Sequence, residues 1–282
     1  MVDLHTHILP GLDDGPTDVT ETLAMCRAAV DDGTTTVVAT PHMAGGLYHV
    51  TREAVLDGVR CLRARLEAEA VPLLVEPGAD IHITPDLPDL LREGRLVTVG
   101  DRPVGSGAYV MLELPHMVIP QGVLEVLFAV QVMGVTPMIS HPERNFEVQN
   151  DPDVVRPWVA AGTVLQLTAA SVVGDFGRRA RRCAHDLLRS RLAHVVASDA
   201  HSAASRPMTT SRRSRPMTTS RRSRPPGLSR ARAVVASLLS AEETEEMFVR
   251  RPPRILAGDN LDLPEPAEPR PTRKERWFSW RR

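Results

Sequence analysis

The sequence of 282 residues predicts an α/β fold, a (β/α) barrel of parallel strands, on three observations. About seven short apolar segments alternate with longer segments of helical periodicity. The apolar segments are rich in β-branched residues, as are parallel strands that helices cover on both faces. Histidines and carboxylates gather directly after these segments, where the loops of such a barrel carry its chemistry.

The first half of the chain contains four of the predicted strands, at residues 2–5, 35–40, 72–78 and 108–114. Each is a short apolar run bounded by turn residues, as a buried strand requires. Residues 17–32 repeat apolar side chains at helical spacing until Gly33 ends the pattern. Residues 51–69 also predict a helix, with one face formed by Val55, Val59, Leu62 and Leu66.

The second half continues the same alternation. Helices are predicted over 121–133, 153–162 and 177–190, and strands over 135–140, 163–168 and 193–198. A last helix is predicted over 229–249. This number of units over this length favours a closed barrel over an open sheet.

Composition and charge exclude several classes of protein. The formal net charge is −1, so the chain as a whole has no charge bias toward nucleic acid or membranes, although basic residues crowd 178–232 and the C-terminus. Three widely spaced cysteines form no disulfide framework and fit a reducing cytosol. No stretch approaches the ~20 apolar residues of a membrane helix, and the start does not resemble a signal peptide. We therefore expect a cytoplasmic protein without a nucleic-acid partner.

An identical repeat divides the C-terminal third of the chain. MTTSRRSRP occurs at 208–216 and again at 217–225. It is either a tolerated duplication in a solvated loop or a basic loop that attracts an anionic partner, and we expect disorder there. We predict one domain over 1–258, with this repeat loop at 208–225.

The last segment, residues 259–282, is rich in Pro and Glu, which predicts an extended tail. Its end combines basic residues with Trp277, Phe278 and Trp280. Such a tail is either solvated or docks on an anionic membrane surface or on a partner.

Side chains of the metal-binding type follow the predicted strands one after another. They are His5, His7, His42, Asp80, Glu113, His141, Asp199 and His201, with Asp13 and Asp14 in the first loop. In His5-Thr-His7 the alternation of a strand puts both imidazoles on one face, so they can share a metal. Imidazole and carboxylate together suit Zn, Mn or Fe, and bridging carboxylates build the multinuclear sites of hydrolases. The remaining histidines, His49, His82, His116, His185 and His194, are interpreted as structural, with His82 and His116 close enough to line the edge of the site.

Nucleophilic catalysis is a weaker interpretation. Cys183 and Arg189 have the C-x₅-R spacing of a cysteine phosphatase loop, but the residues between them are helical and contain no glycine. Such a segment cannot wrap backbone N–H groups around a phosphate. The chain also lacks a G-x-S-x-G elbow, a Walker A loop and a dinucleotide fingerprint.

Six segments resemble the successive motifs of a known superfamily. They are DLHTHILPGLDDGP, ATPHM, EPGADI, LELP, ISHPERN and ASDAHS. Together they resemble the PHP (polymerase and histidinol phosphatase) superfamily, and most closely the bacterial manganese-dependent tyrosine-protein phosphatases of capsular and exopolysaccharide loci, the CpsB/YwqE type. The resemblance spans residues 1–205 and resumes over 226–258.

The resemblance implies a distorted seven-stranded (β/α) barrel with a trinuclear metal centre. One ion would be held by His5, His7, Asp80 and Asp199, a second by Asp80, Glu113 and His141, and a third by Asp14, His42 and His201. Asp13 is the alternative to Asp14. Mn²⁺ is the expected metal, with Fe or Zn possible, at about two to three ions per chain. The family usually has Glu where this chain has the shorter Asp80, so either its loop moves inward or one metal binds more weakly.

The expected reaction is hydrolysis of phosphotyrosine by a metal-bound hydroxide, because cations lower the pKa of water toward ~7. Arg144 would clamp the phosphate through its planar fork. Asp199 or His201 would assist the leaving phenolate, or both would bind metal only. The resemblance implies as substrate a tyrosine-phosphorylated kinase that controls polysaccharide export, near the inner face of the membrane.

Two alternative functions stay open at this point. One is a histidinol-phosphatase-like or other small-molecule phosphoesterase of the same superfamily. The other is a catalytically impaired barrel that serves as a binding or regulatory module. The sequence leaves the oligomeric state open.

Overall fold

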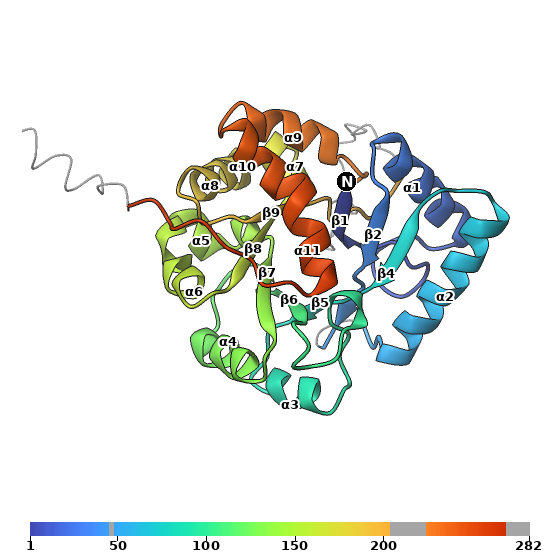
Figure 1. Cartoon of the computed structure of the whole chain (residues 1–282), viewed down its shortest axis with the longest axis horizontal. Helices are drawn as coiled ribbons and strands as arrows, with labels where there is room; N and C mark the ends of the chain where they lie inside the picture. Colours follow the sequence, from blue (N-terminus) through green and yellow to red (C-terminus); the bar gives the residue numbers. More distant parts are fainter. Residues whose placement is uncertain (45–47, 204–223, 269–282) are drawn as a thin grey trace, which may run out of the picture.

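The computed structural model describes residues 1–44, 48–203 and 224–268. In this part of the chain nine strands form two sheets, with the orders β1-β2-β4 and β3-β5-β6-β7-β8-β9, and every pairing is parallel (Figure 1). The strands are β1 (Val2–Thr6), β2 (Thr36–Ala39), β3 (His42–Met43), β4 (Leu74–Pro77), β5 (Asp80–His82), β6 (Tyr109–Glu113), β7 (Thr136–Ser140), β8 (Val164–Thr168) and β9 (Val195–Ala197). The predicted α/β class is confirmed.

The predicted count of seven strands is wrong for the described residues, because two strand positions are broken. The chain leaves β2 and passes through Pro41 before β3, and it leaves β4 at Pro77 before β5. Proline has no N–H for a sheet ladder. Gly78, in the second break, approaches β2 so closely that a Cβ would lie 2.6 Å from Cγ1 of Val38. A parallel bridge between Thr6 and Ala200 joins β1 to the chain just after β9, and the closed barrel stays a prediction.

Helices surround the strands in Figure 1. They are α1 (Val19–Asp31), α2 (Arg52–Ala68), α3 (Leu87–Arg92), α4 (Val123–Val132), α5 (Phe146–Asn150), α6 (Arg156–Ala160), α7 (Ala169–Val173), α8 (Arg178–Arg189), α9 (Leu228–Ala236), α10 (Ala241–Glu245) and α11 (Arg251–Ala257). The single helix predicted over 229–249 is wrong. Ser240 and Glu243 form a capping box that starts α10 after α9 has ended, and a π-helical turn, Glu246–Arg250, follows.

A small apolar cluster inside the strands positions the functional end of the fold. Its members come from six strands, from α11 and from the 3₁₀ turn at Val99, and they include Leu4, Val38, Met111, Met138, Val164, Ala197 and Ile255. Successive side chains of a strand alternate between its faces. The face that carries Met111 therefore carries Glu113 two residues later, and the face of Ala197 carries Asp199. Packing of the apolar side chains in this cluster thus fixes the direction of the polar side chains that follow two residues later.

The N-terminal ends of the strands are covered by α11 and by the segment that follows it (Figure 1). Arg251 of α11 donates to the carbonyl of His194, just before β9, at 3.0 Å, and the Tyr109 hydroxyl donates to the carbonyl of Asp259 at 2.7 Å. Residues 259–268 form neither helix nor strand, and the Ala267 N–H donates to the carbonyl of Ser190 at 3.0 Å. The carboxyl ends of the strands lie at the opposite end of the molecule.

Several sequence predictions fall outside the described residues. The repeat, except for its last two residues, and the aromatic end of the tail lie in the segments 204–223 and 269–282. The domain boundary at 258 stays a prediction. Among the described residues, no helix has both the length and the apolar character needed to cross a membrane.

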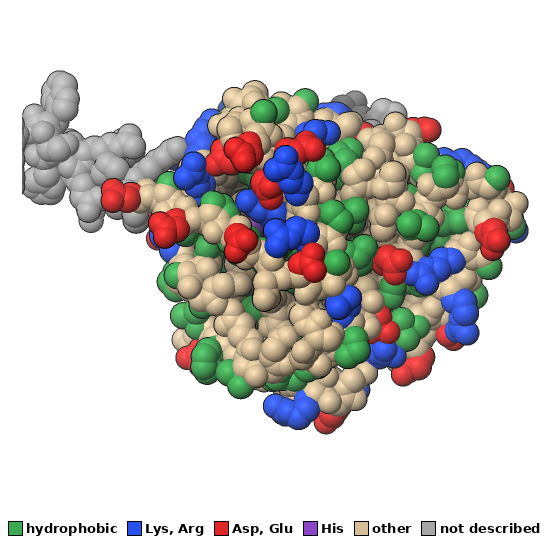
Figure 2. All heavy atoms as spheres, in the orientation of Figure 1, with side chains coloured by type: hydrophobic (Ala, Val, Ile, Leu, Met, Phe, Trp, Pro, Cys, Tyr) green, Lys and Arg blue, Asp and Glu red, His purple; other side chains and the backbone are tan. Residues whose placement is uncertain are grey.

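The surface over α10 and α11 carries acidic and basic side chains in alternation (Figure 2). Several of them form ion pairs, such as Arg250 with Glu246 at 3.0 Å and Arg191 with Glu243 at 3.0 Å. Opposite charges thus offset one another on this face.

Candidate metal centre

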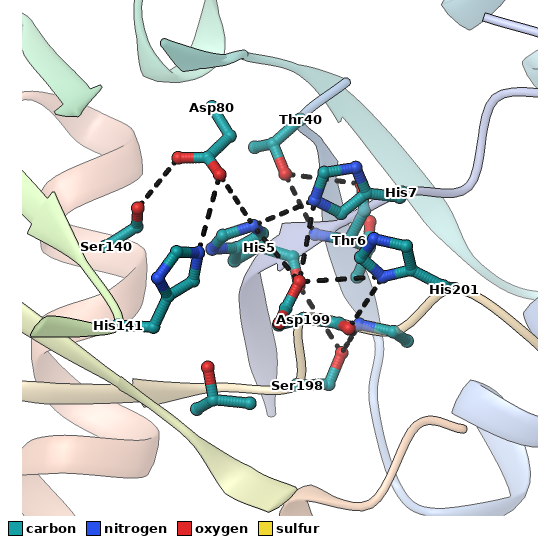
Figure 3. A network of polar contacts seen from close by, with 12 residues as sticks. His5, Thr6, His7, Thr40, Asp80, Ser140, His141, Ser198, Asp199 and His201 are labelled. Carbon is teal, nitrogen blue, oxygen red and sulfur yellow. Dashed lines mark hydrogen bonds and ion pairs between the residues drawn. The ribbon is translucent and has the colours of Figure 1, made fainter. Parts of the chain in front are cut away.

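All nine predicted metal ligands lie together at the carboxyl ends of the strands, and Figure 3 shows part of this cluster. In the described residues, four groups have ligand atoms within 4.8 Å of one another. The groups are His7, Asp14, His42 and His201; His5, Asp80 and His141; His5, His7 and Asp199; and His42, His82 and Glu113. The sharing of residues between groups indicates one continuous centre.

His5 and His7 on and just after β1 face each other and Asp199 (Figure 3). Their Nε2 atoms lie 3.0 Å apart, and each lies 3.5 Å from Oδ1 of Asp199. The Nδ1 atom of His5 lies 2.9 Å from Oε1 of Gln166, and that of His7 lies 2.6 Å from Oδ2 of Asp13. These acceptors hold the N–H on Nδ1, so the Nε2 lone pairs face the centre, as metal-ligating histidines require.

Asp13 and Asp14, which are adjacent in the loop after β1, have different contacts. Oδ2 of Asp13 also accepts from the His42 N–H at 3.1 Å, and Oδ1 accepts from the Gly15 N–H at 2.9 Å. Asp14 Oδ1 has no hydrogen-bond partner, and it lies 3.1 Å from Nε2 of His201 and 3.6 Å from Nε2 of His42. The geometry therefore favours Asp14 as the ligand and Asp13 as the residue that orients His7.

The short side chain of Asp80 points toward His5 and His141 (Figure 3). Its Oδ1 accepts from Oγ of Ser140 at 2.8 Å. Its Oδ2 has no hydrogen-bond partner and lies 3.6 Å from a ring nitrogen of each of three imidazoles, those of His5, His42 and His141. Only one oxygen of Asp80 is therefore without a hydrogen-bond partner.

Glu113 at the end of β6 completes the centre on the side of β5. Its Oε1 lies 3.5 Å from Nε2 of His141, and its Oε2 lies 3.4 Å from Nδ1 of His42 and 3.1 Å from Nδ1 of His82. Sequence reasoning took His82 as structural, and the structure instead places it in a ligand group. The signal was present, since Asp80-Ile-His82 has the same alternate spacing as His5-Thr-His7.

Two arginines converge on one oxygen beside these ligands. Arg144 Nη1 lies 2.7 Å and Arg224 Nη1 lies 2.8 Å from Oδ2 of Asp199. Arg224 Nη2 also lies 3.3 Å from Oδ2 of Asp14. The predicted Arg144 is thus at the site, and Arg224 was missed.

Backbone hydrogen bonds hold Arg224, the next-to-last residue of the repeat, at the site. Its N–H donates to Oγ of Ser202 at 3.0 Å, and its carbonyl accepts from the N–H of His201 at 2.8 Å. Arg224 is thus held beside His201 and Ser202, although these residues are far apart in the sequence. The signal in the sequence was the Arg-Pro step that ends the second copy of the repeat, together with the Pro226 that follows it.

Three residues of the cluster have the ionisation state in which a side chain can bind a cation. Burial would raise the pKa of Asp199, but Arg224, His201 and Arg144 outweigh it and hold this pKa well below its usual range. Burial would also raise the pKa of Asp80, and the neighbouring histidines lower it instead. Burial lowers the pKa of His141 to about 3, so its imidazole is neutral and has a free lone pair.

Glu113 is the exception among the carboxylates. Burial, and then the charge of Asp80, raise the pKa of Glu113 well above its usual range. A cation nearby would offset both effects, because an opposite charge favours the ionised carboxylate.

Two residues of the centre have left-handed backbone conformations that side chains other than glycine rarely adopt. The φ angles are +31° at His141 and +53° at Asp199. Such conformations persist only where the surroundings enforce them, and they concentrate at functional sites. At Asp199 the N–H donates to the carbonyl of His5 at 2.9 Å, which ties this residue to β1.

The unpaired atoms of the cluster fit divalent cations. Buried ligand atoms without a hydrogen-bond partner are Oδ1 of Asp14, Nδ1 of His42, Oδ2 of Asp80, Nδ1 of His82, Oε2 of Glu113, Oδ1 of Asp199 and Nε2 of His201. Such atoms cost free energy when nothing binds them. A mixed set of imidazole nitrogens and carboxylate oxygens suits Mn, Fe or Zn.

Comparison with known proteins agrees with this chemistry. Residues 1–217 match the family described as capsular polysaccharide synthesis, CpsB/CapC. The chain is 35% identical over 210 residues to the tyrosine-protein phosphatase YwqE of Bacillus subtilis, covering 74% of this chain and 81% of that protein. It is 26% identical over 261 residues to the tyrosine-protein phosphatase CpsB of Streptococcus pneumoniae, covering 91% and 98%.

A solved structure supports the same relationship. It comes from work on YwqE of B. subtilis and CpsB of S. pneumoniae, described as metal-dependent tyrosine phosphatases. It matches this chain with a TM-score of 0.84 and 29% identity, over 96% of this chain and 100% of the other. The resemblance predicted from the six motifs is confirmed.

Proposed function

Because the chain belongs to the CpsB/CapC family of capsular polysaccharide synthesis, we propose that it is a metal-dependent phosphatase that hydrolyses phosphotyrosine in proteins. The relatives described above carry that activity in their names. The residues of this chain supply both parts that such a reaction needs, a set of cation ligands and a set of cationic phosphate-binding side chains.

The convergence of Arg144 and Arg224 on Asp199 carries the proposal. Both guanidinium groups lie within 2.8 Å of one carboxylate oxygen, beside the unpaired ligand atoms. A planar guanidinium matches two oxygens of a phosphate, so two of them can hold a phosphoryl group against the centre. Asp199 keeps both arginines oriented toward that position when no substrate is bound.

The metal that we propose is Mn²⁺, with Fe or Zn as alternatives, at about two to three ions per chain. The ligands would be His5, His7, Asp14, His42, Asp80, Glu113, His141, Asp199 and His201. When bound, such cations act as Lewis acids toward phosphoryl oxygens and lower the pKa of water.

The contacts of Asp199 argue against its use as a proton donor to the leaving phenolate. Its Oδ1 faces His5 and His7, its Oδ2 binds two arginines, and its pKa lies well below the usual range. We assign Asp199 to ligation and to positioning of the arginines. His201, whose Nδ1 lies 2.9 Å from the carbonyl of Asp199, presents Nε2 to the centre as a ligand.

The substrate that we propose is a tyrosine-phosphorylated kinase of a polysaccharide export system, acting at the cytoplasmic face of the membrane. The description of the family as capsular polysaccharide synthesis supports this choice. We also propose that residues 1–258 form one distorted barrel, which the Thr6–Ala200 bridge between β1 and the end of β9 supports.

Comparison of substrates tests the proposal against the two alternatives. The Mn²⁺-loaded protein is offered a phosphotyrosine peptide, the matching phosphoserine peptide and histidinol phosphate, and released phosphate is measured. The proposal predicts the highest kcat/KM for phosphotyrosine. A preference for histidinol phosphate would favour the small-molecule phosphoesterase, and no turnover of any substrate would favour a binding module.

A further inference from the structure

His82 is a histidine of the centre to which the proposed mechanism assigns no role. It is the last residue of β5, and the alternation of the strand puts it on the same face as Asp80. In the sheet register His82 pairs with Glu113 on β6, and Asp80 pairs with His42 on β3. Three neighbouring strands therefore bring these four side chains together at their carboxyl ends.

The contacts of His82 are those of a ligand group. Its Nδ1 lies 3.1 Å from Oε2 of Glu113, and Nδ1 of His42 lies 3.4 Å from the same oxygen. All three atoms are buried and lack a hydrogen-bond partner, and Glu113 is only 6% exposed. A buried carboxylate oxygen aimed between two unpaired ring nitrogens costs free energy unless a proton or a cation lies between them.

The neighbouring Asp80 supplies few metal-binding atoms on the side of the centre next to Glu113. One of its oxygens is bound by Ser140, and the other lies at an equal 3.6 Å from three imidazoles. A carboxylate with one oxygen already engaged by a hydroxyl is a weaker bridge between two ions than a carboxylate with both oxygens unpaired. An additional metal ligand beside Glu113 therefore strengthens the binding of a cation on this side of the centre.

We propose that His82 is a metal ligand, which binds through Nδ1 the ion that Glu113 holds. This inference rests on the proposed metal-dependent function and extends its centre by one residue. The side chain of His82 is 37% exposed, so it closes the centre on the solvent side. The ion that it holds should exchange with solvent more readily than an ion held by the fully buried His5 and His7.

Metal binding by the full chain tests this inference separately from catalysis. Protein stripped with a chelator is titrated with Mn²⁺, free Mn²⁺ is followed by electron paramagnetic resonance, and bound metal is counted by plasma mass spectrometry. His82→Ala is expected to weaken the binding of one ion at least tenfold and to leave the other ions unchanged. The control is His116→Ala, at an exposed histidine after β6 that belongs to none of the described ligand groups, and it should bind like the parent.

Two further variants, Glu113→Gln and His82→Gln, distinguish the loss of a metal ligand from a loss of stability. Glu113→Gln should weaken the same ion, and the double variant should lose no further ion. His82→Gln, which keeps a polar side chain, should repeat the loss while the metal-free melting temperature stays that of the parent. Parent-like stoichiometry and affinity in both His82 variants would overturn the inference. A parent chain that binds no Mn²⁺ at all would instead contradict the proposed function.

Discussion

Nδ1 of His7 and Oδ2 of Asp13 lie 2.6 Å apart, and this contact assigns different roles to two adjacent carboxylates. Asp13 directs the lone pair of His7 toward the centre, while Asp14 presents an unpaired oxygen to His201 and His42. Hydrogen bonds of the first kind tune a ligand, whereas an oxygen of the second kind is itself available as one.

Substitution by Asn should therefore affect metal binding differently at Asp13 and at Asp14. Asp14→Asn should lose one ion per chain. Asp13→Asn should keep the ion count and weaken binding by about 10–100-fold, as loss of a partner that orients a ligand does. Mn²⁺ titration of the stripped proteins measures both effects. If Asp13→Asn lost an ion and Asp14→Asn did not, the assignment would be reversed.

The two arginines should act on substrate and not on metal. Arg144→Ala and Arg224→Ala should each lower kcat for a phosphotyrosine peptide by about 10²–10³-fold, the usual effect of removing one group that stabilises transition-state charge. Metal content should stay that of the parent. Arg179→Ala is the matched control, because Arg179 lies over the ring of Phe146 and contacts no ligand. Parent-like turnover in Arg224→Ala would remove that residue from the mechanism.

The repeat should be dispensable for catalysis. Ser202 and Arg224, which is the next-to-last residue of the repeat, are joined by a 3.0 Å hydrogen bond. Deletion of residues 206–223 removes two nine-residue units and joins Ser205 directly to Arg224. Because the contacts of His201 and Ser202 with Arg224 can still form across this short connection, kcat and metal content should stay within about twofold of the parent. Loss of phosphatase activity with intact metal binding would show that the repeat contributes to the reaction.

Glu143 should make stability depend on pH. It is fully buried, its Oε1 accepts from the Thr168 N–H at 3.0 Å, and burial raises its pKa from 4.5 to about 7. Its contribution to stability is complete below pH 4.5, where folded and unfolded chains are both protonated. It is lost as pH rises through 7, because the unfolded chain ionises first.

Glu143→Gln removes this titration and keeps an oxygen that can accept from Thr168. Relative to the parent, the variant should gain roughly 2–4 kcal/mol of unfolding free energy between pH 4.5 and 8. Urea unfolding of the metal-free proteins at several pH values measures the difference. A difference that does not change with pH would contradict the buried acid.

The side chains predicted to bind metal could be grouped from sequence because their pattern is local. Alternation puts His5 and His7 on one face, and the carboxyl ends of parallel strands converge, so each strand end could be considered separately. The alternate spacing of Asp80 and His82 is visible in the sequence, but only the register of β5 against β6 pairs His82 with Glu113. Arg224 was missed because only the folded chain brings it back beside His201.

The errors in the fold have equally local causes. The third predicted strand, 72–78, ends as β4 at Pro77, and β5 begins at Asp80, beyond a break that apolar content alone does not reveal. The long helix predicted over 229–249 ignored the capping signal of Ser240 and Glu243. In both cases a backbone hydrogen-bonding feature outweighed the hydrophobic pattern.

The most direct test of the account combines metal binding and turnover in one titration. The protein is stripped with a chelator, Mn²⁺ is added in steps, and bound metal and phosphate release from a phosphotyrosine peptide are measured at each step. The account predicts no turnover in the stripped protein and full turnover only after about two ions per chain are bound. Turnover at the parent rate in the stripped protein would contradict it.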